Sequence, residues 1–116
     1  MLEVAATLLV IGALGGILMA AIRFSGNRNP PTWLAMIHGL IAAAGLTLLA
    51  YATFTTGVPT LAKAALALLL VAALGGAVIN LRDHWHRNLI SKTWVIGHFM
   101  LAATGLALLL RVTWFN

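Results

Sequence analysis

The sequence predicts an all-α membrane protein whose four transmembrane helices form a bundle. Hydrophobic residues make up 62% of the chain and charged residues only 8%, whereas soluble domains carry roughly 25% charged residues. The apolar residues also gather in four runs, each near the length of about 20 residues that a helix needs to cross a membrane. An internal repeat further predicts that the bundle is built from two parallel two-helix units.

The four apolar runs are separated by short polar connections. The predicted spans cover residues 4–22, 33–54, 61–81 and 93–112. Helix is expected throughout, because an open strand in lipid would leave backbone groups unpaired. The connections 23–32 and 55–60 are rich in turn-forming residues, and Thr32 and Thr60 are expected to cap the helices that follow. The third connection, 82–92, is the most polar stretch of the chain.

The basic residues predict the orientation in the membrane. The chain carries seven Lys and Arg residues. Those at the first and third connections are Arg23, Arg28, Arg82, Arg87 and Lys92. Lys63 and Arg111 lie near the opposite side. Because cytoplasmic loops carry an excess of Lys and Arg, the first and third connections are expected in the cytoplasm and both termini outside. A bacterial inner membrane is the expected location.

The single predicted membrane domain, residues 1–116, contains two similar halves, residues 1–56 and 61–116. A displacement of 60 residues places Gly15-Gly16 on Gly75-Gly76 and His38 on His98 without a gap. Gly45 falls on Gly105 in the same register. Each half holds two spans, so both halves enter the membrane in the same direction. Parallel repeats are related by an axis along the membrane normal, which predicts equivalent positions for the second and fourth helices.

His38 and His98 are the strongest candidates for a functional site. Each lies inside an apolar run, where an ionisable side chain is costly and usually has a functional partner. They follow Trp33 and Trp94 by five and four residues, which places both roughly 6–8 Å deeper at the helical rise. Two neutral imidazoles at one depth on facing helices suit the axial positions of haem iron. One haem b is therefore the predicted cofactor.

Small and basic residues near the histidines extend this prediction. Gly45 and Gly105 lie seven residues beyond the histidines on the same helical faces, and they leave room either for a porphyrin edge or for close helix contact. Arg23 and Arg82 are candidates for binding haem propionates by charge-assisted hydrogen bonds. The other interpretation of these arginines is that they record membrane orientation alone.

Several other functions lack the residues they require. The chain has no cysteine, which excludes thiolate metal sites. Glu3 and Asp83 are the two carboxylates, and neither lies in mid-membrane, so a carboxylate proton relay is not expected. His84 and His86 form a two-residue metal-like motif that is more typical of an interfacial loop. The alternative role of either histidine is proton exchange with a quinone or contact with a haem propionate. Nucleic acid is not an expected partner, because the chain has no polar domain to present its basic residues.

With paired membrane histidines, glycines on helical faces and a duplicated two-helix unit, the sequence resembles small four-helix b-type cytochromes. It is broadly similar to the cytochrome b561 group and to the haem-binding membrane anchors of succinate dehydrogenase. This resemblance implies one bis-histidine haem b at His38 and His98, and electron exchange with a quinone or a small oxidant. A second haem is not implied, because His84 and His86 lie in a loop.

The sequence therefore favours a membrane electron-transfer protein, acting with quinol or a partner redox protein. If it is an enzyme, an oxidoreductase is expected. The alternative is a non-catalytic small membrane subunit that anchors or assembles a larger complex. The hydrogen-bonded contact between two helices would then be the role of the histidine pair. The bilayer is the expected environment, and the small size of the chain favours a homodimer or a partner membrane subunit.

Overall fold

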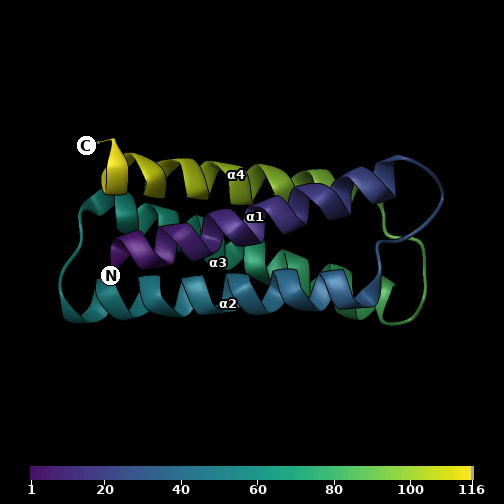
Figure 1. Cartoon of the computed structure of the whole chain (residues 1–116), viewed down its shortest axis with the longest axis horizontal. Coiled ribbons are helices and arrows are strands. Elements are labelled where there is room, and N and C mark those ends of the chain that lie inside the picture. Colours follow the sequence, from purple (N-terminus) through teal and green to yellow (C-terminus); the bar gives the residue numbers. More distant parts are fainter. Residues whose placement is uncertain (116) are drawn as a thin grey trace.

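The computed structural model describes residues 1–115, and within this range the chain forms four α-helices and one π-helical turn (Figure 1). The elements are α1 (Leu2–Phe24), α2 (Thr32–Thr55), α3 (Thr60–Ile79), η1 (Asn80–His84) and α4 (Lys92–Trp114). The α-helices are long and apolar enough to cross a membrane, with α3 continuing through η1. The predicted all-helical fold class is confirmed.

The helices form two hairpins that lie side by side. α1 packs along α2, and α3 packs along α4, while the hairpins meet through α1 against α4 and α2 against α3. The helices α2 and α4 therefore occupy one diagonal of the bundle. The α1–α2 and η1–α4 loops lie together at one end, called here the loop end (Figure 1). The N-terminus, the α2–α3 turn and the end of α4 lie at the other, the terminal end.

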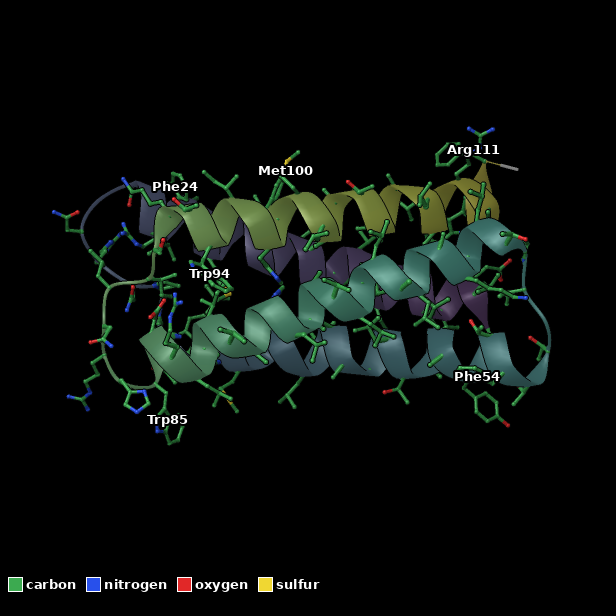
Figure 2. All side chains as sticks on the ribbon, turned by 180° about the vertical axis from the view of Figure 1, so that it is seen from behind. Phe24, Phe54, Trp85, Trp94, Met100 and Arg111 are labelled. Atoms are coloured by element: carbon green, nitrogen blue, oxygen red, sulfur yellow. The ribbon has the colours of Figure 1, made fainter. Side chains whose placement is uncertain are left out.

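The outer surface of the bundle is apolar and carries aromatic side chains at both ends. Trp33, Trp85 and Trp94 are exposed at the loop end, and Phe54 and Trp114 at the terminal end. Figure 2 shows Trp85 and Trp94 near the loops and Phe54 at the opposite end. Aromatic residues concentrate at the two membrane interfaces of integral proteins. The surface is therefore that of a bundle immersed in lipid.

The interior is closely packed in the terminal half of the bundle. Leu49 and Leu109 are completely buried there, together with Ala5, Ala6 and Ala65. Side chains of α1 and α3 fit against glycines on the partner helix of each hairpin. A Cβ atom at Gly45 would lie 2.7 Å from Leu9 Cγ, and one at Gly105 would lie 2.8 Å from Leu69 Cγ. These glycines thus allow the helices of each hairpin to approach closely.

The helix boundaries differ from the predicted ones in two details. Thr32 and Thr60 are the first helical residues and not the caps, because the carbonyls of Pro31 and Pro59 accept the first bonds. Helical structure also continues past residue 81 through η1. Its wide turns are closed by bonds five residues apart, from Trp85 N to Asn80 O at 2.7 Å and from Asn88 N to Asp83 O at 2.8 Å. Such insertions occur often at functional sites.

We expect Gly45→Ala and Gly105→Ala to destabilise the protein by about 1–3 kcal/mol each, because the new methyl group overpacks the contact with Leu9 or Leu69. Thermal unfolding in mild detergent measures the effect. Gly75→Ala is the matched control, since a Cβ there meets nothing within 4 Å. An unchanged melting temperature for both contact variants would contradict the packing role of these glycines.

Candidate functional site

His38 and His98 meet at the centre of the bundle. Their side chains come from α2 and α4, the two helices on one diagonal. The ring centroids are 6.2 Å apart and the ring planes are nearly perpendicular, at 82°. Both rings are half-buried. The two residues singled out in the sequence are therefore brought together in space.

Each imidazole is held by a backbone carbonyl of the other helix of its own hairpin. The Nδ1 atom of His38 lies 2.7 Å from Gly12 O, and the Nδ1 atom of His98 lies 2.7 Å from Ala72 O. A carbonyl only accepts hydrogen bonds, so Nδ1 carries the proton in both rings. In a neutral imidazole, Nε2 then keeps a free lone pair. This arrangement is the usual outer-shell support of a histidine that ligates a metal.

The Nε2 atoms are open to the interior space. Among residues 1–115, neither Nε2 atom has a hydrogen-bond partner in the protein, and neither is a fully enclosed unsatisfied atom. Both histidines line two cavities of the bundle. The pair thus presents two unused nitrogen lone pairs to a space inside the membrane domain.

Gly16 and Gly76 form the surface on which the imidazoles rest. A Cβ atom at Gly16 would lie 3.0 Å from His38 Cε1, and one at Gly76 would lie 3.0 Å from His98 Cε1. A methyl group at either position would push the ring away from its carbonyl partner. The sequence marked these glycines as equivalent small residues that leave room for a porphyrin edge or for helix contact, but it did not predict that they support the imidazole rings. These glycines lie four residues after Gly12 and Ala72, whose carbonyls accept the imidazole hydrogen bonds on the same helical face, and this spacing is the signal for that role.

The two cavities flank the histidine pair. The larger, about 370 Å³, lies mainly on the α2–α3 side, and the smaller, about 320 Å³, lies mainly on the α1–α4 side. Both touch His38, His98 and small residues such as Ala42 and Ala73. The two cavities lie beside the same histidine pair and are together called here the central slot. A flat apolar ligand between the hairpins would have one histidine on each side.

Gly45 and Gly105 are placed differently from the expectation that they make room for a cofactor. Neither residue lines either of these two cavities, and both are buried against leucines of the neighbouring helix. Gly45 and Gly105 share a helical face with the histidines, but Leu9 and Leu69 occupy the space beside them. Close helix contact, the second interpretation of these residues, describes their position. The glycines that contact the imidazole rings are Gly16 and Gly76.

Arg82 also lies outside the central slot. Its guanidinium makes two hydrogen bonds to the Asp83 carboxylate, at 2.8 and 2.7 Å, and stacks 4.6 Å from the centroid of the Trp94 ring. Arg82 does not line either cavity. The π-helical turn directs this side chain to Asp83 and Trp94, so its placement does not match the expected contact with a cofactor.

Arg23 and His84, in contrast, reach the larger cavity at the loop end. The Arg23 guanidinium is buried and donates from Nε to Ile90 O at 2.6 Å and from Nη1 to Gly26 O at 3.2 Å. His84 bonds through Nε2 to Pro30 O at 2.9 Å. Its neighbour His86 is exposed and bonds to Leu81 O at 2.8 Å. The two histidines of this motif therefore point to different surroundings and do not form a joint metal site.

His38 and His98 suit a cofactor that takes two ligands from the protein. Residues 1–115 contain no cluster of three or more His, Cys, Asp or Glu side chains. Ions such as zinc, which need three or four protein ligands, thus have no matching set in this part of the chain. Haem needs only its two axial ligands from the protein. The supported imidazole pair, with its free Nε2 atoms and adjoining slot, fits that requirement.

The fold and the site thus define a four-helix membrane bundle with a paired-histidine centre. Comparison with models of known protein families, with curated proteins and with solved structures found no match for this chain.

We expect Gly16→Ala and Gly76→Ala to loosen the imidazole that rests on each glycine, because the ring must move by a few tenths of an ångström. Nitrogen NMR of the labelled protein without added cofactor should show Nδ1-protonated histidines at residues 38 and 98. Each variant should convert its own histidine to a mixture of tautomers. Gly75→Ala, on a position free of contacts, should leave both unchanged. An unchanged tautomer in the Gly16 and Gly76 variants would contradict the supporting role of these glycines.

Proposed function

We propose that this chain is a membrane electron-transfer protein that binds one haem b, with His38 and His98 as the axial ligands. The observation that carries the proposal is the pair of imidazoles whose Nδ1 atoms are bonded to Gly12 O and Ala72 O and whose Nε2 atoms remain free. Bound haem supplies reversible one-electron chemistry at its iron. The protein supplies the ligands, the apolar surroundings and the position of the centre in the bundle.

The separation of the two rings supports a shared metal atom. Metal–imidazole bonds are about 2 Å long, so two imidazoles on one metal have ring centres roughly 6 Å apart. The observed centroid distance is 6.2 Å. Because the histidines come from opposite hairpins, they would bind the cofactor from both sides of the central slot. The backbone bonds at Nδ1 would also make each ligand more basic and fix its orientation.

The central slot favours an electron partner that reaches the centre from within the membrane or from its surface. Its lining is largely apolar, with polar residues near the loops. A quinol in the bilayer or a partner redox subunit is the proposed donor or acceptor. A homodimer or a partner membrane subunit fits the exposed apolar surface of the helices. If such electron exchange is catalysed, the protein is an oxidoreductase.

Purified wild-type protein from haem-replete cells is expected to show a b-type reduced-minus-oxidised absorption spectrum. His38→Ala or His98→Ala should abolish this spectrum or lower haem occupancy at least about tenfold, since each removes one of two ligands. His86→Ala is the matched control and should retain it, because His86 is exposed and lines neither cavity. A colourless wild-type protein would refute the proposal and favour the anchoring or assembly role.

We also propose that the loop end faces the cytoplasm of a bacterial cell and that both termini lie outside. Of the seven basic residues, only Lys63 and Arg111 are not at the loop end; Figure 2 shows Arg111 at the terminal end. Positive charge favours retention in the cytoplasm. Alkaline phosphatase, which is active only outside the inner membrane, should be active when fused after α4 and inactive when fused in the α1–α2 loop. The reverse pattern would contradict this topology.

A further inference from the structure

Arg23 is a buried cation, and within residues 1–115 no carboxylate forms a salt bridge with it. Its exposed fraction is 6%. The sequence contains two acidic residues; Glu3 lies at the opposite end of α1, and Asp83 is paired with Arg82 through both oxygens. The hydrogen-bond partners of Arg23 are the neutral carbonyls of Ile90 and Gly26. An uncompensated charge in an apolar interior is costly, so this position favours an anion supplied by a ligand.

The guanidinium retains donors for such an anion. Arginine has five N–H groups, and the bonds to Ile90 O and Gly26 O use two of them. Arg23 lines the larger cavity, which also contains His38 and His98. A planar guanidinium with free N–H groups is well suited to binding a carboxylate through two parallel bonds.

Two further polar side chains line the same end of this cavity. Asn80 begins η1, and His84 ends it. The Asn80 side-chain amide makes no hydrogen bond with other residues in the range 1–115. The smaller cavity lacks such a cluster: its residues on the α1–α4 side include Ile17, Phe99 and Leu106. Polarity at the loop end is thus confined to one of the two cavities.

We propose that Arg23, Asn80 and His84 form a carboxylate-binding subsite for the ligand of the central slot. On the function proposed above, on which this inference rests, the carboxylate is that of a porphyrin. Arg23 supplies the compensating charge, and Asn80 supplies an amide donor. His84 is held by the bond between its Nε2 and Pro30 O, and its imidazole adds a further polar group to the subsite. The ligand is therefore oriented with its carboxylate edge toward the loops.

The loops hold this subsite in place. Asn29 donates from Nδ2 to Asn88 O at 2.7 Å and accepts through Oδ1 from Ile90 N at 2.9 Å. Its side chain thereby joins the α1–α2 loop to the η1–α4 loop. Ile90 also accepts the bond from Arg23 Nε, so the position of the guanidinium depends on the joined loops.

The test compares metal-free protoporphyrin IX with its dimethyl ester, in which both carboxylates are blocked. Neither compound contains iron, so binding does not need a metal–histidine bond. We expect the free acid to bind wild-type protein in detergent at least about tenfold more tightly than the ester, by fluorescence titration. Arg23→Gln should remove this preference, and Asn80→Leu should reduce it. Arg28→Gln, at the same end of the bundle, should retain it.

Equal binding of the two porphyrins by wild-type protein, or no binding of either, would overturn the subsite. Displacement of protoporphyrin by an equal concentration of palmitate would overturn it in favour of a lipid carboxylate site. If Arg23→Gln fails to fold, the comparison of the free acid with the ester in wild-type protein still decides the question. Arg23→Lys then tests a positive charge that lacks the paired N–H groups of the guanidinium. The absorption spectrum with haem tests the bis-histidine function separately, so the two failures are distinguishable.

Discussion

The hydrogen bond from an imidazole to a backbone carbonyl is the constraint on which the centre of this bundle depends. A histidine inside an apolar helix pair needs a polar partner, and the carbonyls of Gly12 and Ala72 provide it. To reach these oxygens, each ring must lie directly on the neighbouring helix. That contact requires a residue without a side chain, which explains Gly16 and Gly76. The same bond settles which nitrogen remains free to act as a ligand.

The bundle is packed more closely in its terminal half than in the half near the loops, where the histidine pair lies. In the terminal half, leucines and alanines fill the interior, and Gly45 and Gly105 bring the helices of each hairpin together. In the half nearer the loops, small residues around the histidines leave the central slot. A slot between hairpins would weaken a bundle that depended on uniform packing. Here the closed half and the joined loops hold the hairpins on either side of it.

The fold and the histidine pair follow from simple features of the sequence. Four apolar runs set the helices, and the equal depth of His38 and His98 indicated that they would meet. The roles of Gly45 and Arg82 did not follow, because each depends on how neighbouring helices turn. Gly45 shares a face with His38, yet Leu9 fills the space at that level. Arg82 lies on the π-helical turn, and periodicity based on an α-helix does not predict where such a turn directs its side chains.

The charged and polar residues around the two histidines differ, and this difference favours one orientation of a bound ligand over the other. His38 and His98 have matching bonds and matching glycine contacts, so the pair alone would accept a flat ligand in two equivalent orientations. Residues at corresponding positions remove that equivalence: Ala20 corresponds to Asn80, and Arg23 to Asp83. Asp83 neutralises Arg82, whereas buried Arg23 has no carboxylate partner among residues 1–115 and lines the larger cavity. A symmetric pair of ligands within an asymmetric charge pattern would therefore hold an asymmetric cofactor in one orientation.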